Sequence, residues 1–239
     1  MRNYGHRSCP SCPSSDAYFV YRDGHGHCFS CGYHDHGTKS IASMKKKISM
    51  EIEAVSSINT SVYTPDLPKI AVLWLKKYGI SNKEISDHKL MWNLKTTSLC
   101  FPIYSGNKLV ITNERYFGVE MNHPKYLTKG NKTGIMHVIG QPTNLVVLVE
   151  DFVSAIKVGR QYASVPLLGS TIPGNWLPSL CGRFSKVRVW LDSNKRLESV
   201  LEASRTSQYI PDSKAIFSDR DPKEYSDESI GELISVSVV

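Results

Sequence analysis

The sequence predicts an α/β protein, α+β overall, in which a small cysteine-containing module precedes a domain built on a parallel β-sheet. Two apolar runs predict the sheet: residues 144–149 end in Glu150 and Asp151, and residues 187–191 end in Asp192. Short β-branched runs, each followed by a helical pattern, are typical of buried parallel strands joined by crossover helices. Because such sheets bind ligands at the carboxyl ends of their strands, we expect a metal ion beside these acids.

The composition fits a globular protein that contacts a polyanion. A chain of 239 residues suits one small module and one domain with its own core. Lys and Arg outnumber Asp and Glu by 29 to 22, and the net charge of +7 favours a partner such as nucleic acid. No stretch has the apolar length of a membrane span or of a signal-peptide core, so we expect a cytoplasmic protein with no membrane contact. Two isolated cysteines, Cys100 and Cys181, are expected to be buried small hydrophobic residues.

Four further cysteines near the start of the chain form two Cys-x-x-Cys pairs: Cys9 with Cys12, and Cys28 with Cys31. Each pair places two thiolates on one side of a tight turn, and two such pairs complete the tetrahedral shell of a structural zinc ion. Aromatic residues and an Asp23-Gly24 turn lie between the pairs, which is typical of a zinc-ribbon hairpin. We assign residues 1–37 to this ribbon. Free or redox-active thiols are the alternative, which the spacing disfavours.

A linker is expected after the ribbon, over residues 38–65. This segment shows no sustained amphipathic period, is rich in Ser and Thr, and contains the run Lys45-Lys46-Lys47. Such a composition is typical of a solvated tether. The ribbon is therefore expected to be able to move relative to the next domain.

A small basic α+β subdomain is expected over residues 66–143. Residues 67–78 carry apolar side chains at helical spacing, and Gly79 is a helix stop. Ser81 and Glu84 form the capping box of a second short helix. The subdomain thus begins with two helices.

An antiparallel hairpin, residues 98–104 and 109–112, follows these helices and is predicted to present a basic stretch. The cations of this stretch alternate with aromatic residues and are Arg115, Lys125, Lys129 and Lys132. Basic side chains among aromatic rings suit single-stranded nucleic acid, because the charges follow the phosphates while the rings stack on the bases. A half-exposed β surface explains the same pattern equally well.

The parallel sheet and its helices are expected over residues 144–239. After the first acidic strand end, the apolar pattern predicts, in order, a helix at 153–162, strands at 165–168 and 187–191, a helix at 197–203, a strand at 215–217 and a helix at 229–234. The last of these strands leads into Asp221. The alternation of strands and helices is typical of a parallel sheet.

Three acids, Glu150, Asp192 and Asp221, therefore follow three predicted strands. A single acid after a strand is often only a helix N-cap. Three acids that converge at one edge of a sheet are better explained as ligands of Mg²⁺ or Mn²⁺, which prefer carboxylate, water and phosphate oxygens. The chemistry that this suggests is phosphoryl transfer.

This order of motifs resembles DNA primases of the Toprim class, above all the primase half of bacteriophage primase-helicases, and also bacterial replicative primases. The resemblance spans nearly the whole chain. Besides the four cysteines, it is carried by Asp23-Gly24-His25, by Pro124-Lys-Tyr-Leu127, by Val149-Glu-Asp151, by Leu167-Leu-Gly169-Ser170 and by Trp190-Leu-Asp-Ser-Asn194. It implies a zinc ribbon and a Toprim RNA polymerase domain.

The resemblance also implies an activity and its residues. The activity is that of a nucleotidyltransferase, a DNA-directed RNA polymerase that makes short RNA primers on a single-stranded DNA template from nucleoside triphosphates. Catalytic Mg²⁺ or Mn²⁺ would be held by Glu150, Asp192, Asn194 and Asp221. Lys125 would act beside them, and it would bind template or nucleotide phosphates with Arg115, Lys129 and Lys132. The ribbon, with its structural zinc, would help to choose the template.

Further partners follow from the same resemblance. The sequence contains no Gly-x-x-x-x-Gly-Lys-Ser/Thr phosphate loop, so we expect the replicative helicase to be a separate chain, as well as the DNA polymerase. If the protein is viral, its location would be the host cytoplasm.

Two departures from the family pattern leave alternatives open. Ser154 and Asn194 stand where the family has acids, and the loss of two carboxylates weakens metal binding unless Asp151 or Asp219 compensates. A catalytically weakened accessory protein that binds single-stranded DNA is therefore a second hypothesis. A Toprim nuclease or a topoisomerase fragment is a third, and it is disfavoured because a topoisomerase needs further domains.

Overall fold

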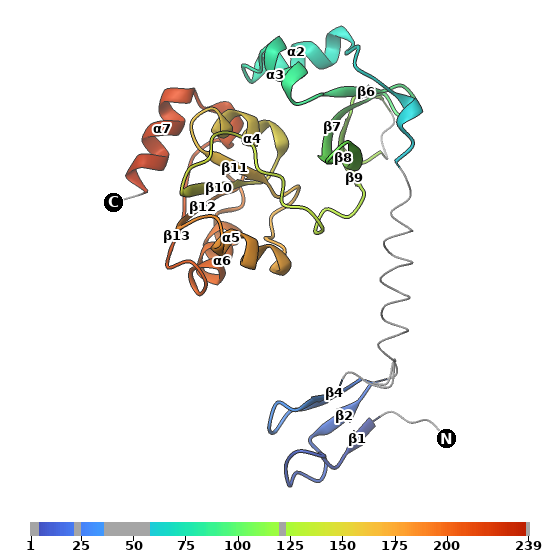
Figure 1. Cartoon of the computed structure of the whole chain (residues 1–239), viewed down its shortest axis with the longest axis vertical. Coiled ribbons are helices and arrows are strands. Elements are labelled where there is room, and N and C mark those ends of the chain that lie inside the picture. The colour runs from blue at the N-terminus through green and yellow to red at the C-terminus, as the bar shows by residue number, and fades with distance from the viewer. Residues whose placement is uncertain (1–4, 22–24, 36–57, 120–122, 238–239) are drawn as a thin grey trace. The chain divides into compact units, whose positions relative to one another are not determined.

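The computed structural model describes residues 5–21, 25–35, 58–119 and 123–237, which belong to two units, Met1–Ser56 and Ser57–Val239 (Figure 1). The predicted Asp23-Gly24 turn and most of the predicted linker lie outside the described residues. The predicted α/β class, with a parallel sheet and an N-terminal four-cysteine cluster, is confirmed. None of the helices in the described ranges has the length and apolar character that crossing a membrane requires.

The first unit contains a four-stranded antiparallel sheet. Its strands follow the chain order and are β1 (Gly5–Arg7), β2 (Tyr18–Val20), β3 (Gly26–Cys28) and β4 (His34–Asp35). Tyr18 on β2 is buried between Cys9 and Cys28, which form the small core of this unit. The described residues of this unit bury few apolar side chains. A metal ion bound by the four cysteines would therefore add substantially to the stability of the module.

The second unit begins with a five-stranded antiparallel sheet. Its strands lie in the order β5 (Tyr63–Thr64), β6 (Met91–Asn93), β7 (Ser98–Ser105), β8 (Lys108–Tyr116) and β9 (Tyr126–Lys129), after a 3₁₀ turn η1 (Thr60–Val62). The predicted hairpin is β7 and β8. Residues 63 and 64, which the sequence placed in the linker, pair with Trp92 and Asn93 and form an edge strand.

Two helices precede this hairpin, as the sequence predicts. Helix α2 (Lys69–Lys77) ends before Gly79, whose φ of +72° is a conformation that favours glycine. Helix α3 (Asn82–Asp87) begins with the predicted capping box, in which Ser81 and Glu84 satisfy each other's backbone N–H groups.

The parallel sheet has the strand order β11 (Ala163–Pro166), β10 (Leu145–Val149), β12 (Lys186–Trp190) and β13 (Asp212–Ala215). The elements around it are α4 (Phe152–Gly159), η2 (Gly174–Trp176), α5 (Leu177–Cys181), α6 (Arg196–Ser207), η3 (Pro222–Glu224) and α7 (Asp227–Val236). All five residues of β10 are buried. Val147 and Val149 pack in the core that contains α4 and α7, whereas Val146 and Leu148 pack in the core that contains α5. Both faces of the sheet are covered, which explains the continuous apolar runs.

The prediction for the two isolated cysteines is half right. Cys100 on β7 is buried, but Cys181 is exposed. Cys181 is the last residue of α5, a helix that buries Leu177 and Leu180 on its inner face. As the last residue of the helix it is left exposed, with its Sγ 3.7 Å from the carbonyl oxygen of Tyr209.

Candidate functional site

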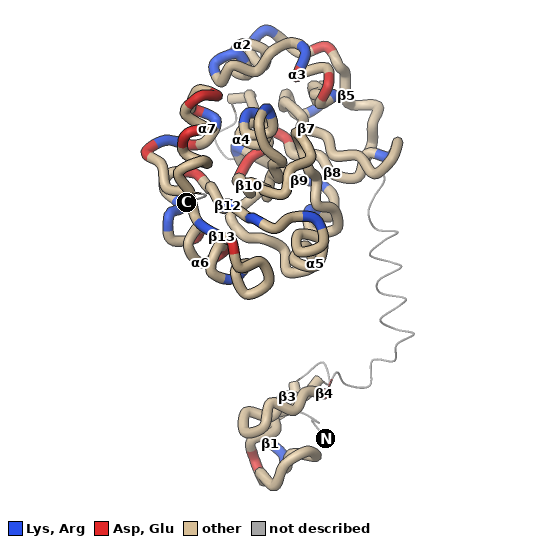
Figure 2. Tube along the Cα trace, turned by 60° about the vertical axis from the view of Figure 1, so that its left-hand side comes forward, with Lys and Arg blue, Asp and Glu red and all other residues tan. Residues whose placement is uncertain are grey.

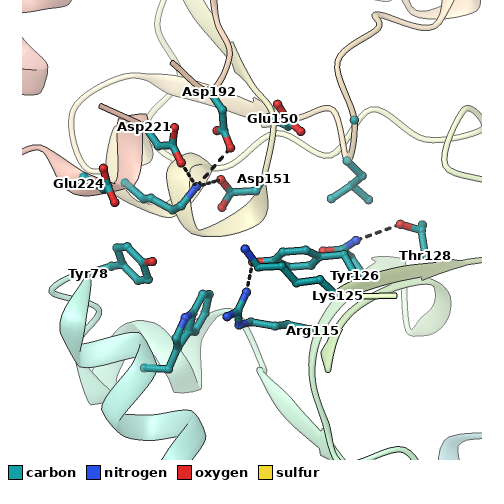
Figure 3. Close-up of a pocket in the computed structure, with 15 residues that line it drawn as sticks. Tyr78, Arg115, Lys125, Tyr126, Thr128, Glu150, Asp151, Asp192, Asp221 and Glu224 are labelled. Carbon is teal, nitrogen blue, oxygen red and sulfur yellow. Dashed lines mark hydrogen bonds and ion pairs between the residues drawn. The ribbon is translucent and has the colours of Figure 1, made fainter. Parts of the chain in front are cut away.

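The structure brings together Glu150, Asp192 and Asp221 at one rim of the parallel sheet (Figure 3). Glu150 directly follows β10, and Asp192 comes two residues after the end of β12; these two strands are parallel neighbours, so they end at the same edge. Asp221 precedes η3 in the segment that follows β13. All three side chains line a cavity of about 410 Å³.

A lysine that the sequence did not predict at the site, Lys223, lies among these acids. Its Nζ atom is 3.0 Å from an oxygen of Asp221, 3.0 Å from one of Asp151 and 3.5 Å from one of Asp192. The local signal was the sequence Asp221-Pro222-Lys223, which places a cation two residues after a predicted metal ligand. Although burial disfavours the charged ammonium, these carboxylates raise the pKa of Lys223.

Asp151 explains why a serine stands at position 154. Asp151 is the N-cap of α4 and accepts hydrogen bonds from the backbone N–H groups of Val153 and Ser154, at 2.9 and 3.1 Å. Its other oxygen accepts a 2.7 Å bond from the Ser154 hydroxyl as well as the bond from Lys223. Asp151 lines the cavity, whereas Asp219 is 94% exposed and pairs with Arg196 at 3.7 Å. Of the two acids that could compensate for Ser154 and Asn194, only Asp151 lies at the site.

The three carboxyl groups differ in their pKa shifts and in how many hydrogen bonds they accept. Burial raises the pKa of Asp192 to about 7, against the influence of Lys223, and burial also raises the pKa of Glu150. Asp221 is half-buried, and although burial acts in the same direction, hydrogen bonds from Lys223 and Ser193 lower its pKa. Glu150 Oε2 and Asp192 Oδ1 are buried without a hydrogen-bond partner. Two uncompensated oxygens at the end of a sheet fit a divalent cation, which binds one or two carboxylates and completes its shell with water or phosphate.

Asn194, the fourth predicted metal ligand, is not among the residues that line the cavity. The turn after β12 is closed by a 2.8 Å hydrogen bond from the N–H of Lys195 to the carbonyl of Asp192. Asn194 lies in this turn with its side chain exposed.

The cavity also has a basic and aromatic wall, which is lined by Trp74, Tyr78, Arg115, Lys125 and Tyr126. Figure 3 shows the last four of these across from the acids. The guanidinium of Arg115 lies 4.3 Å from the Trp74 ring centroid and donates a 3.1 Å hydrogen bond to the Tyr126 hydroxyl. Arg115 Nε is buried without a partner. Arg115 and Lys125 were predicted to bind phosphates, whereas Trp74 and Tyr78 were not predicted at the site, because their only signal was their place in an apolar helical pattern.

The other two predicted basic residues have different surroundings. Lys129 forms a 2.8 Å ion pair with Glu114, whose side chain is only 2% exposed. Glu114 also accepts hydrogen bonds from Tyr63 and Asn93, so Lys129 belongs to a buried network of the antiparallel sheet. Lys132 donates a 3.2 Å bond to the carbonyl of Leu168. Neither Lys129 nor Lys132 is among the residues that line the cavity.

The turn from Leu168 to Gly169 completes the lining of the cavity. Leu168 has a φ of +52°, which costs free energy for a residue with a branched side chain. Strained backbone of this kind persists where the surrounding structure holds it, and it is common at ligand sites. Figure 2 shows positions of Lys and Arg and positions of Asp and Glu spread over several elements of this unit.

The four N-terminal cysteines form a separate site in the first unit. Their sulfur atoms all lie within 4.8 Å of one another, with 3.7 Å between Cys9 and Cys31 and 3.8 Å between Cys12 and Cys28. A tetrahedral zinc ion with Zn–S bonds of about 2.3 Å requires sulfur separations of about 3.8 Å. The cluster therefore fits a structural zinc ion.

Solved structures share the fold of this chain, although no model of a known protein family and no curated protein sequence matches it. The zinc-binding and RNA polymerase domains of the Aquifex aeolicus primase give a TM-score of 0.56 at 14% identity, over 97% of this chain and 78% of that chain. The DnaG catalytic core gives a TM-score of 0.54 at 14% identity, over 80% of this chain and 79% of that chain. The primase fragment of the bacteriophage T7 primase-helicase gives a TM-score of 0.46 at 15% identity, over 99% of this chain and 100% of that chain. The predicted resemblance is thus confirmed for the fold.

Proposed function

We propose that this chain is a DNA primase, a nucleotidyltransferase that synthesises short RNA primers on single-stranded DNA. One observation carries the proposal: a rim of carboxylates faces Arg115, Lys125 and three aromatic rings across a single cavity. Nucleotidyl transfer needs acids that can hold a divalent cation and, opposite them, cationic side chains that can hold phosphates. The shared fold with the Aquifex primase, a protein with zinc-binding and RNA polymerase domains, supports the same activity.

In this proposal each wall has its own task. Glu150 and Asp192 hold Mg²⁺ or Mn²⁺ through their uncompensated oxygens, while Asp221 is kept ionised by Ser193 and Lys223. A divalent cation there would neutralise triphosphate charge and stabilise the charge that develops when a primer 3′-hydroxyl attacks the α-phosphorus.

The residues of the basic wall bind the nucleic acid. Lys125, which is exposed at the cavity, and Arg115, with its unpartnered Nε, bind phosphates of template or nucleotide. The rings of Trp74, Tyr78 and Tyr126 supply faces on which bases stack. The partners are single-stranded DNA, nucleoside triphosphates and the RNA primer. A separate replicative helicase and a DNA polymerase would act before and after primer synthesis, in the cytoplasm.

Oligoribonucleotide synthesis tests this proposal. The full chain is incubated with single-stranded DNA of mixed sequence, the four ribonucleoside triphosphates and either Mg²⁺ or Mn²⁺, and labelled products are resolved by length. We expect short RNA products, and Glu150→Gln should lower their yield about a hundredfold or more, because it removes one charge from the cation site. Asp219→Asn is the matched control, since it removes an exposed acid outside the cavity. Absence of product with both metals over a broad range of templates would reject the proposal.

A second candidate function is a DNA-binding accessory protein with a weakened catalytic centre. Two observations favour it: Lys223 occupies the space between three of the acids, and Ser154 and Asn194 supply no carboxylate. This function predicts salt-dependent binding of single-stranded DNA without synthesis. Asp192→Ala would leave such binding unchanged, whereas in a primase the same variant loses primer synthesis.

A further inference from the structure

Lys223 lies where a cation shared by several carboxylates would lie. Its ammonium lies 3.0, 3.5 and 3.0 Å from oxygens of Asp151, Asp192 and Asp221, three acids that Figure 3 shows grouped at the rim. Its side chain is only 11% exposed. An ammonium is a compact point charge with three donors, so it can satisfy three carboxylates at once.

The backbone of Lys223 is held as firmly as its ammonium. The residue belongs to η3, which begins at Pro222, and its carbonyl accepts a 3.3 Å hydrogen bond from the buried Lys157 on α4. Pro222 directly precedes Lys223, and its ring fixes its own φ at the start of this turn. Lys223 is therefore a permanent part of the acidic rim and not a surface side chain that happens to reach it.

The ammonium leaves one side of the rim uncompensated. Glu150 Oε2 and Asp192 Oδ1 are the buried carboxylate oxygens of the rim that have no partner, and Lys223 contacts the other oxygen of Asp192. Sites with two metal ions place them about 3.5–4 Å apart, between shared carboxylates. A second divalent ion at the Asp151 and Asp221 side would have to displace a buried ammonium or lie against it, and both are opposed by charge repulsion.

We propose that Lys223 replaces one of two divalent cations, so that this site binds a single exchangeable metal ion, between Glu150 and Asp192. The inference rests on the proposed function for its substrate, a nucleoside triphosphate, but the number of metal ions can be measured without substrate. The lysine supplies a fixed positive charge to the rim, and the exchangeable ion supplies the coordination of phosphate oxygens.

A titration with Mn²⁺ tests the inference in the full, zinc-loaded chain. Free Mn²⁺ is measured by its electron paramagnetic resonance signal at neutral pH. We expect the wild type to bind one Mn²⁺ that Asp192→Asn loses. Lys223→Met, which keeps the aliphatic stem without the charge, should bind two. Lys83→Met is the control, since it removes one lysine charge from the exposed side of α3 and should leave the count at one.

Each result decides the inference. If the wild type binds two Mn²⁺ ions and Asp192→Asn loses both, the inference is wrong, whether or not the Lys223 variant folds. If Lys223→Met folds and still binds one ion, the inference is also wrong. Primer synthesis measured on the same samples separates the two claims. If the wild type makes primers but binds two ions, the proposed function stands and the inference is wrong. If it binds a single ion and makes no primers, the inference stands and the proposed function is wrong.

Discussion

Arg160 joins three segments of the second unit, and its removal gives a quantitative test of what these contacts contribute to the stability of the unit. Arg160 follows α4 and donates two hydrogen bonds to Glu84 on α3, at 2.8 and 3.1 Å, and two to Asp227 on α7, at 2.7 and 3.0 Å. A fifth bond, of 2.8 Å, goes to the carbonyl of Gly79. The helical part of the basic wall is therefore connected to the parallel-sheet subdomain through one guanidinium.

The pKa of Glu84 sets the size of the effect. Burial opposes ionisation of this carboxyl, but hydrogen bonds from Arg160 and Ser81 outweigh burial and lower its pKa from 4.5 to about 2. At about 1.4 kcal/mol per pKa unit this shift corresponds to about 3 kcal/mol. Part of this free energy comes from the hydrogen bonds of Ser81, and solvent screening reduces it further, so the pair with Arg160 contributes about 2 kcal/mol. The half-exposed pair with Asp227 adds about 0.5 kcal/mol. Arg160→Met should therefore lower the free energy of unfolding by about 2.5 kcal/mol.

Denaturant and thermal unfolding of the zinc-loaded chain measure this loss. A decrease of about 5–10 °C in the melting temperature of the larger unit is expected for its size. Because the pKa of Glu84 is lower in the folded state, its contribution is complete above pH 4.5 and is lost as the pH falls toward 2, so wild type and Arg160→Met should converge over that interval. Arg196→Met, at an exposed and longer pair, is the control and should change stability by less than about 0.5 kcal/mol. A melting temperature of Arg160→Met equal to that of the control would refute the reasoning.

Three further predictions concern the zinc cluster, a glycine and the basic wall. Cys28→Ser should reduce bound zinc from one ion per chain to nearly none by elemental analysis, and it should leave the unfolding of the larger unit unchanged; retention of the ion would contradict the assigned ligands. Gly140 has a φ of +93°, and a Cβ there would lie 2.3 Å from the carbonyl oxygen of Gly159, so Gly140→Ala should cost more than about 2 kcal/mol in denaturant unfolding, whereas Gly174→Ala, with open space around it, should cost little. Arg115→Lys should weaken binding of single-stranded DNA about tenfold in fluorescence anisotropy at fixed salt, because lysine lacks the planar group that stacks on Trp74; equal affinities would argue against a binding role for this wall.

Much of the fold could be predicted from the sequence, because the patterns that indicate its helices and buried strands lie within a few consecutive residues. The run before Glu150 is continuous since both faces of β10 are buried, and the capping box of α3 lies within four residues. Strand β5 carried no such signal, because two residues become a strand only through pairing with β6. Cys181 was placed wrongly because a five-residue helix gives too little periodicity to show which face is buried.

The candidate site divides in the same way. The positions of Glu150 and Asp192 could be predicted, because parallel strands bring their ends to one edge. The position of Lys223 could not, because its ion pair with Asp151 joins residues 72 apart in the chain. Composition likewise could not separate Lys125, which lines the cavity, from Lys129, which neutralises a buried glutamate that only the folded sheet places beside it.

The most direct measurement of the central claim is a crystal structure of the chain soaked with Mn²⁺ and a nucleoside triphosphate, with the metal located by its anomalous scattering. We expect an anomalous peak within coordinating distance of Glu150 and Asp192, with triphosphate oxygens completing the shell on the side of Arg115 and Lys125. A peak away from these two carboxylates, or a nucleotide bound outside the cavity, would contradict it.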